Sequence, residues 1–201
     1  MRASEQDRAD IQLARRRWRP RRRRQAGWDP ARLVFLDESG AKTNMTRLRG
    51  RALRGKRVHA SAPCGHWKIT TMISSIRLDN TTACMTIESA TDTEVFRTYV
   101  KEVHLSDAQA RRHRHHGQSG SAQKRTHSGA HRTGSGHPLF LPAYSPDLNP
   151  IEKMWSKIKH SLRSAEARTT DQLRTAIAGA LHRVTPKEAP HWFATCSYSF
   201  I

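Results

Sequence analysis

Two acidic residues stand at positions from which a folded chain could bring them together. Asp37 closes the short apolar run Leu33–Leu36, which predicts a buried strand that ends in an acid. Glu152 lies in the first turn of a predicted helix that starts at Asn149 and Pro150. Such acids can converge on one edge of a sheet, and two or three carboxylates hold a pair of Mg²⁺ ions. Paired ions clamp the attacking and leaving oxygens of an in-line phosphoryl displacement.

Each acid also has an ordinary structural explanation. Glu152 fits the third position of a helix capped by Asn149, a common arrangement at helix starts. Asp37 fits a turn residue at the end of its strand. The metal site is favoured only by the two acids taken together with a strongly basic surface around them.

The charge of the chain indicates a polyanionic partner. The 201 residues include 36 Lys and Arg against 17 Asp and Glu, so the formal net charge is +19 and the pI is about 11.2. Nucleic acid is the first expectation, and a basic protein of the ribosomal or tail type is the alternative. No apolar run is long enough for a membrane span or a signal peptide. The scattered Cys64, Cys84 and Cys196 fit a reduced cytosolic protein without a zinc site or disulfides.

Basic residues gather in two stretches of the chain. Residues 1–30 are a basic N-terminal arm, in which we expect any helix to stop at Pro20, inside the run Arg15–Arg24. This arm either contacts phosphates or is solvated. Residues 42–60 contain no acid and predict a basic excursion before a return strand. The excursion carries the candidate DNA contacts Arg47, Arg49, Arg51, Arg54, Lys56 and Arg57.

The other segments predict an α/β domain. Residues 67–79 and 81–89 are rich in β-branched side chains and are joined by an Asp-Asn turn, which indicates a hairpin. Residues 139–146 are typical of a strand and turn. Apolar residues at helical spacing and capping residues predict four helices, in residues 91–105, 149–163, 169–184 and 185–196.

Residues 106–138 do not fit this plan. They contain no Val, Ile, Leu, Met, Phe, Trp or Tyr, six of the chain's 12 histidines, and a single acid, Asp107. We therefore expect no element of the core in this stretch. A disordered basic loop is one explanation. A metal site at the sequence HRHH is another, but it has no carboxylate or cysteine partner.

Three segments resemble the catalytic domain of bacterial insertion-sequence transposases of the mariner superfamily. They are LVFLDESGAKTNMTRLRGRALRGKR, GHWKITTMI and LFLPAYSPDLNPIEKMWSKIK, and YSPDLNPIE within the third is the most specific match. The resemblance covers nearly all of residues 31–201 except 106–138. It implies a DDE-type catalytic domain with a ribonuclease-H-like (integrase-type) mixed sheet flanked by helices.

The resemblance also implies a reaction and its participants. Asp37 matches the first catalytic acid and Glu152 the third, both as ligands of a two-metal site for Mg²⁺ or Mn²⁺. The expected activity is cleavage of DNA at transposon ends and transfer of the freed 3′-OH into target DNA. Lys153 and Lys157 join the candidate DNA contacts. A homodimer is compatible with this function, whereas a membrane or a small-molecule substrate is not expected, and the expected location is the bacterial cytoplasm at the nucleoid.

The second catalytic acid of the resembled family is missing. The family has a strand ending in Asp between Leu105 and Leu139, within a motif resembling MDNLGxHK, and nothing here matches it. A frame shifted by one base from Gln109 onward can nevertheless spell PGDIVIMDNLGxHK. The hidden Asp then falls at Gly117–Gln118, and 34 residues (118–151) separate Gly117 from Glu152. We hypothesise that 106–138 is a frameshifted stretch that has cost the domain a central strand.

Three functions remain open at this point. The first is a DDE transposase catalytic domain that is inactive as encoded, because it lacks one metal-binding acid. The second is a non-catalytic, basic DNA-binding remnant of a transposase, the product of a decayed gene copy. The third is a ribonuclease-H-like nuclease that acts on other nucleic acids, against which the YSPDLNPIE match argues.

Overall fold

A sheet with helices on both of its faces forms the body of the molecule. The computed structural model describes residues 4–24, 30–80, 82–88, 91–104, 129–132 and 138–198. Within them the five strands have the order β3-β2-β1-β4-β5. Their bounds are β1 (Leu33–Lys42), β2 (Ile69–Arg77), β3 (Thr82–Ile87), β4 (Gly129–Arg132) and β5 (Pro138–Phe140). The expected α/β class is confirmed.

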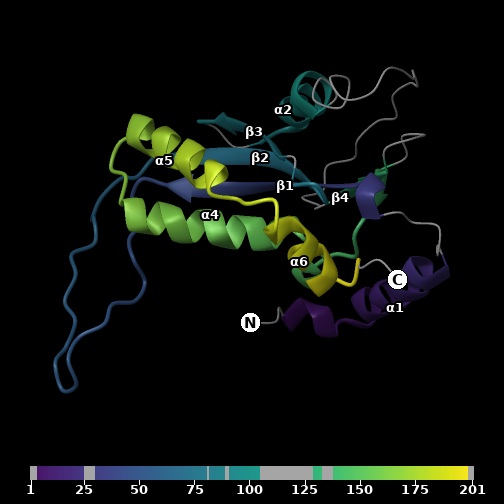
Figure 1. Cartoon of the computed structure of the whole chain (residues 1–201), viewed down its shortest axis with the longest axis horizontal. Coiled ribbons are helices and arrows are strands. Elements are labelled where there is room, and N and C mark those ends of the chain that lie inside the picture. Colours follow the sequence, from purple (N-terminus) through teal and green to yellow (C-terminus); the bar gives the residue numbers. More distant parts are fainter. Residues whose placement is uncertain are drawn as a thin grey trace.

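Helices cover the two faces unequally. Figure 1 shows α4, α5 and α6 on one face of the sheet and α2 on the other. The N-terminal helix α1 lies near α6, by the end of the sheet that carries β4. The helices are α1 (Ala9–Arg24), α2 (Thr93–Thr98), which continues as the π-helical turn η3 (Tyr99–His104), α4 (Ile151–Ala165), α5 (Thr170–His182) and α6 (Glu188–Thr195). Short 3₁₀ turns are η1 (Ser4–Asp7), η2 (Pro30–Arg32) and η4 (Pro146–Leu148).

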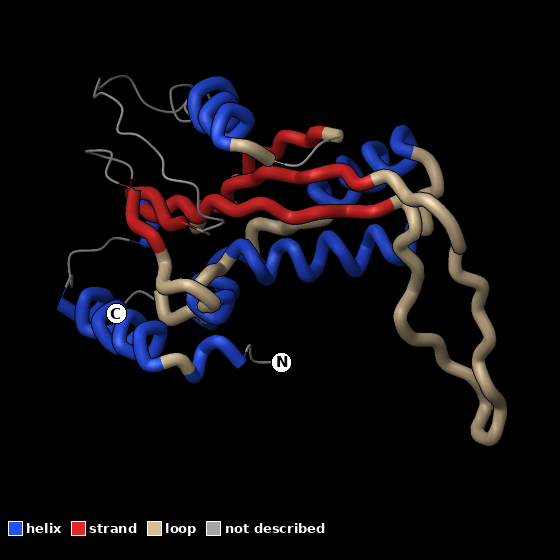
Figure 2. The backbone as a smooth tube through the Cα atoms, turned by 180° about the vertical axis from the view of Figure 1, so that it is seen from behind, coloured by secondary structure: helices blue, strands red, loops and turns tan. Residues whose placement is uncertain are grey.

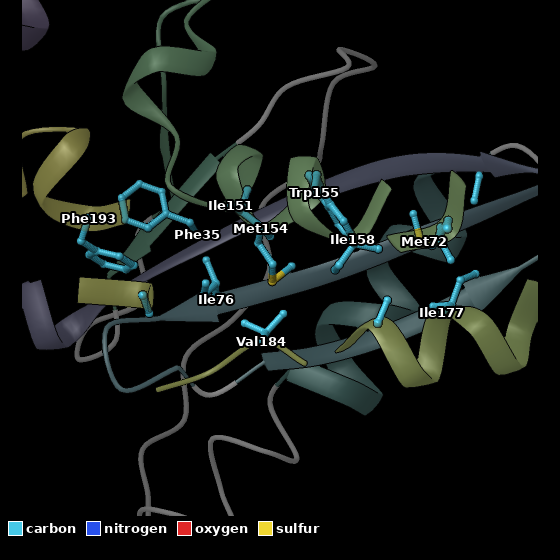
Figure 3. Packing of buried hydrophobic residues seen from close by; sticks show 14 of the residues in the cluster. Phe35, Met72, Ile76, Ile151, Met154, Trp155, Ile158, Ile177, Val184 and Phe193 are labelled. Atoms are coloured by element: carbon cyan, nitrogen blue, oxygen red, sulfur yellow. The ribbon is translucent and has the colours of Figure 1, made fainter. Parts of the chain in front are cut away.

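The main core lies between β1, β2 and the helices α4, α5 and α6. Alternate residues of a strand point to opposite faces, so Leu33 and Phe35 of β1 share this face with the position of Asp37. Figure 3 shows Phe35 against Phe193 of α6, with ring centroids 5.2 Å apart in an edge-to-face arrangement. Buried residues of α4 follow its inner face: Ile151, Met154, Trp155, Ile158 and Leu162. This packing fixes the start of α4 against the middle of β1.

The opposite face of the sheet has a smaller core. Leu36 of β1 and Ile73 of β2 pack with Tyr99, which is fully buried at the junction of α2 and η3. The Tyr99 hydroxyl donates to the Ala83 carbonyl of β3 at 2.8 Å. Both faces of β1 are therefore covered, as its continuous apolar run predicts.

The helix and hairpin signals in the sequence are confirmed. Asp92 caps α2 by accepting a hydrogen bond from the Val95 N–H at 2.8 Å. Asn80 has φ of +65° in the β2–β3 turn, a left-handed conformation that Asn tolerates well. At the start of α6 the capping differs from the sequence pattern: the helix begins at Glu188 with Lys187 as its N-cap, and Glu188 accepts hydrogen bonds from the backbone N–H and hydroxyl of Thr185.

Four expectations about the elements were wrong. β1 does not end at Asp37 but continues to Lys42, because β2 pairs with it along its whole length, from Val34↔Arg77 to Lys42↔Ile69. The helix α1 runs through Pro20 to Arg24. A proline inside a helix removes one backbone hydrogen bond and can bend the helix without ending it.

The third wrong expectation concerns residues 106–138. β4 lies inside this stretch and pairs with β1 from Leu33↔Arg132 to Leu36↔Gly129. The pairing of β4 with β1 needs only backbone hydrogen bonds, so the lack of apolar side chains does not forbid it.

The fourth wrong expectation concerns the direction of the strands. Every strand pairing among the described residues is antiparallel, whereas a mixed sheet was expected. Only five residues (133–137) separate β4 from β5, too few for the crossover that a parallel pair requires.

Candidate active site

Asp37 lies in the middle of β1, on the face that packs against α4. Its Oδ1 accepts a hydrogen bond from the Glu38 N–H at 2.9 Å, and Ser74 of β2 is its cross-strand neighbour. The run Leu33–Leu36 before it is buried, so the strand holds the carboxyl at the margin of the core rather than in solvent. Asp37 itself is partly buried.

Glu152 lies in the first turn of α4, where the helix approaches β1. Its neighbour Ile151 is fully buried and anchors this end of the helix, while Glu152 is partly buried. Asn149, three residues before Glu152, hydrogen-bonds to the Asp37 carboxylate, and the charge of Glu152 contributes to the raised pKa of Asp37. The structure therefore brings together the two acids, 115 positions apart in the sequence, that the sequence analysis singled out.

Asn149 joins the two acids and does not have its expected role. Its Nδ2 donates to Asp37 Oδ2 at 3.2 Å, and its side chain makes no capping bond to α4. Its carbonyl oxygen accepts from the backbone N–H of Glu152 at 3.2 Å, so Asn149 hydrogen-bonds to the carboxylate of Asp37 and to the backbone of Glu152. Asn149 is fully buried, and its Oδ1 has no hydrogen-bond partner among the described residues. The prediction of an Asn149–Glu152 capping box is wrong, because the amide is turned toward β1.

The site holds more negative charge than it neutralises. Burial, and next the charge of Glu152, raise the pKa of Asp37 to about 7. Burial also raises the pKa of Glu152, against the opposing charges of Lys159 and Lys153. A raised carboxyl pKa means that the ionised form is poorly solvated, so a divalent cation beside the two acids would stabilise it.

Lys159 was missed by the sequence analysis. It is the nearby cation that opposes the raised pKa of both Asp37 and Glu152. The signal was its position seven residues after Glu152, which is two helical turns and therefore the same face of α4.

The carboxylates of Asp37 and Glu152 supply part of the ligand set that a divalent cation needs. Both are hard oxygen donors with raised pKa, which suits Mg²⁺ or Mn²⁺. In the part of the chain that the structure describes, no group of three or more His, Cys, Asp or Glu side chains could hold a metal. Gly117 and Gln118, where the missing acid was expected, lie outside the described residues. So do most of 106–138 and the sequence HRHH.

Six of the candidate DNA contacts lie on an arm that leaves the body of the molecule. Figure 2 shows residues 43–68 as a long loop extending away from the sheet. Every residue from Arg47 to Ile69 is exposed. At the base of the arm Thr43 N–H donates to the Lys68 carbonyl at 3.2 Å, and Arg168 donates to the carbonyls of Thr43 and Met45. The arm thus presents Arg47, Arg49, Arg51, Arg54, Lys56 and Arg57 to solvent from a fixed base.

The two lysines of α4 lie in different surroundings. Lys153 is exposed next to Glu152. Lys157 is held at 2.6 Å from both carboxylate oxygens of Glu188, and it also donates to the Arg183 carbonyl. Lys157 therefore ties α4 to the segment that precedes α6.

Comparison with known proteins places most of the chain, including the two acids, within one family. The model of the family described as DDE superfamily endonuclease matches residues 32–174, which include Asp37, Asn149 and Glu152. None of the curated proteins compared with the chain matches it. Among the described residues, no helix has the length and apolar character needed to cross a membrane. Since the matched residues make up well over half of the sequence, the chain belongs to the DDE superfamily of endonucleases.

Proposed function

We propose that the chain is the catalytic domain of an insertion-sequence transposase of the mariner superfamily, with a ribonuclease-H-like fold, and that it does not cleave DNA as encoded. The observation that carries this proposal is the meeting of Asp37 and Glu152 through Asn149, inside the family-matched residues. The sheet with helices on both faces supports the fold assignment, while the antiparallel pairing of β4 with β1 and β5 departs from the mixed sheet of that fold.

Asp37 and Glu152 would hold Mg²⁺ or Mn²⁺. A two-metal centre supplies Lewis-acid stabilisation of the attacking and leaving oxygens in phosphoryl displacement. β1 and the start of α4 set the separation of the carboxylates, and Asn149 holds the Asp37 carboxylate in one orientation. Lys159 lowers the cost of ionising both acids, and Lys153 lowers that of Glu152.

The basic arm and the charge of the chain would bind DNA. The base of the arm at Lys42 is five residues of β1 beyond Asp37, which corresponds to roughly 17 Å along an extended strand. Basic side chains on the arm could therefore contact phosphates several base pairs away from a phosphate at the acids. Lys42 Nζ also lies 5.6 Å from the Trp67 ring centroid, a cation–π contact that stabilises the base of the arm.

The missing acid is the reason for the proposed inactivity. Within the described residues, the strand next to β1 on the β4 side is Gly129–Arg132, which contains no carboxylate. Loss of one metal-binding acid removes a charged ligand, and the described residues hold no third His, Cys, Asp or Glu side chain that could replace it. A frameshift within 106–138 explains both the missing acid and the unusual composition of the stretch.

A frame-restored variant tests this proposal directly. Residues Ala110–Gln123 would be replaced by PGDIVIMDNLGSHK, and both proteins would be incubated with supercoiled plasmid and Mn²⁺. We expect nicking by the restored protein, loss of nicking on adding Asp37→Asn or Glu152→Gln, and no nicking by the chain as encoded. Asp37-dependent nicking by the encoded chain would refute the proposed inactivity. A folded restored protein that binds DNA without nicking it would refute the catalytic assignment.

The exposed arm favours a second candidate function, that of a non-catalytic DNA-binding remnant. The arm and its flanks contain no acid from Thr43 to Lys68, so its phosphate affinity needs no intact metal site. DNA binding by the encoded chain that is unchanged in Asp37→Asn and Glu152→Gln, together with absent nicking, is the result expected for this function.

A further inference from the structure

The N-terminal segment packs on the connection that leads into the acid site. This connection is residues 141–149, between β5 and α4. Trp18 of α1 forms a small apolar cluster with Leu141 and Leu148, and all three are at most 7% exposed. The cluster is separate from the main core, so it is α1 that shields this side of the connection from water.

Arg15 makes the main polar contact between α1 and the connection. Its guanidinium pairs with both carboxylate oxygens of Asp147, at 2.9 and 2.6 Å, and it also donates to Ser145 Oγ at 2.5 Å. The Arg15 side chain is only 18% exposed. A two-pronged pair between Arg and a carboxylate restricts orientation as well as distance. With these contacts made, Arg15 is less available to DNA phosphates than the residues of the exposed arm.

A third contact holds a residue in an unfavourable backbone conformation. Tyr144 has φ of +54°, in the left-handed region that costs a non-glycine residue free energy. Gln6 of η1, itself 7% exposed, donates from Nε2 to the Tyr144 carbonyl at 2.5 Å. Strained conformations persist where surrounding contacts enforce them, and here one of those contacts comes from the N-terminal segment.

The contacted residues are next to the site. Asn149, which donates to Asp37, follows Asp147 by two positions, and Glu152 follows by five. Leu148 and Asn149 N–H groups donate to the carbonyls of Ser145 and Pro146, at 3.0 and 3.2 Å, so the turn transmits its position along a short hydrogen-bonded path. Tyr198, near the end of the chain, donates to the Leu148 carbonyl at 3.0 Å and supports the turn from the other side.

We propose that residues 4–18 position the acid site, with Arg15 as the residue that orients the connection 141–149 and, through Asn149, the Asp37–Glu152 pair. This segment lies outside the family-matched residues 32–174, so the family match assigns it no role. The metal readout of the test below rests on the proposed function, whereas the exchange readout does not.

Amide hydrogen exchange on the full chain tests the positioning role. In Arg15→Ala we expect the Leu148, Asn149 and Glu152 amides to exchange roughly tenfold faster, because a charged two-pronged hydrogen bond no longer closes the turn. Amides of β2 should keep their wild-type rates. Arg8→Ala is the matched control, since the Arg8 guanidinium hydrogen-bonds to Asp10 on the same segment, and both side chains are 60% exposed. This control should leave all of these rates unchanged.

Mn²⁺ titration adds a readout that a merely structural contact would not change. Arg15→Ala should weaken Mn²⁺ binding roughly tenfold, as loss of an orienting residue does at other metal sites. The charge-swapped Arg15→Asp/Asp147→Arg variant should recover part of both the exchange protection and the Mn²⁺ affinity. Unchanged exchange at residues 148–152 in Arg15→Ala, or equal acceleration in β2, would overturn the positioning role. If the wild-type chain shows no Asp37-dependent Mn²⁺ binding, the proposed metal site fails, and the exchange rates alone decide on the positioning role.

Discussion

Asn149 and Asp37 are joined by a hydrogen bond of 3.2 Å that links the turn before α4 to the middle of β1. The bond crosses from one element to another, beside the Asp37 carboxylate and three residues before Glu152. The backbone carbonyl of Asn149 accepts the Glu152 N–H, and the side-chain amide of the same fully buried residue reaches Asp37. The geometry of the site therefore depends on Asn149. The consequences of changing that amide can be measured.

Asn149→Asp places a third carboxylate beside Asp37 at nearly unchanged volume. Without metal we expect the free energy of unfolding to fall by about 2–4 kcal/mol, since the new charge is buried next to like charges. Mg²⁺ or Mn²⁺ should raise the melting temperature of this variant more than that of wild type, because three oxygens bind a divalent cation better than two. Asn149→Ala is the control and should lose stability without gaining metal dependence. An equal metal-induced shift in all three proteins would argue against a cation site here.

The pH dependence of the metal-free protein should reveal the burial of Asp37. The pKa of Asp37 is raised to about 7 in the folded state, whereas the same side chain in the unfolded chain has a pKa of about 4. Between these values the folded state binds more protons than the unfolded state, so stability falls as pH rises from about 4 to about 7. The contribution is at most about 4 kcal/mol. Chemical denaturation in Asp37→Asn should show a shallower decline and higher stability at pH 7.5. An identical pH profile in this variant would contradict the raised pKa.

Much of the fold was predictable because it follows from local patterns. The run Leu33–Leu36, the Asp79–Asn80 turn and the cap at Asp92 are signals within a few residues of each other, and the structure confirms them. The pairing of Asp37 with Glu152 was predicted from a strand and a helix start, together with a family resemblance. Such inferences need only that the two elements meet, which burial of their apolar faces favours.

The remainder depended on long-range contacts that sequence patterns do not show. The extent of β1 to Lys42 is set by the length of β2, and the position of β4 by pairing through backbone groups alone. Asn149 appeared to be a helix cap, and only its approach to Asp37 shows otherwise. Arg15 was one of many arginines in a basic run, and nothing in its neighbours singled it out for Asp147.

Lys157 should contribute to stability and little to DNA affinity. It is bound to Glu188 and the Arg183 carbonyl, and it helps to lower the pKa of Glu188 against the effect of burial. Lys157→Met keeps the aliphatic stem and should cost about 1 kcal/mol, since the pair is only partly buried. That stabilisation is present above about pH 4.5 and is lost as pH falls through the lowered pKa of Glu188. Lys153→Met is the control, because Lys153 is exposed, and it should lower stability less than Lys157→Met does. A larger loss of DNA affinity in Lys157→Met than in Lys153→Met would assign Lys157 to the DNA surface instead.

The exposed arm should account for much of the salt dependence of DNA binding. Replacing Arg47, Arg49, Arg51, Arg54, Lys56 and Arg57 by Gln removes side chains that are all exposed, so the melting temperature should stay within about 2 °C of wild type. Each phosphate contact contributes roughly 0.9 to the slope of log K against log salt concentration, so loss of six contacts would reduce the slope by about 5. Fluorescence anisotropy with a labelled duplex at several NaCl concentrations measures this slope.

The control is Arg168→Gln. Arg168 donates to the carbonyls of Thr43 and Met45, so this change loosens the base of the arm while the charges of the arm remain. A smaller change of slope in this control would show that phosphate neutralisation, rather than the attachment of the arm, dominates binding. An unchanged slope in the six-fold variant would place the DNA surface elsewhere on the molecule.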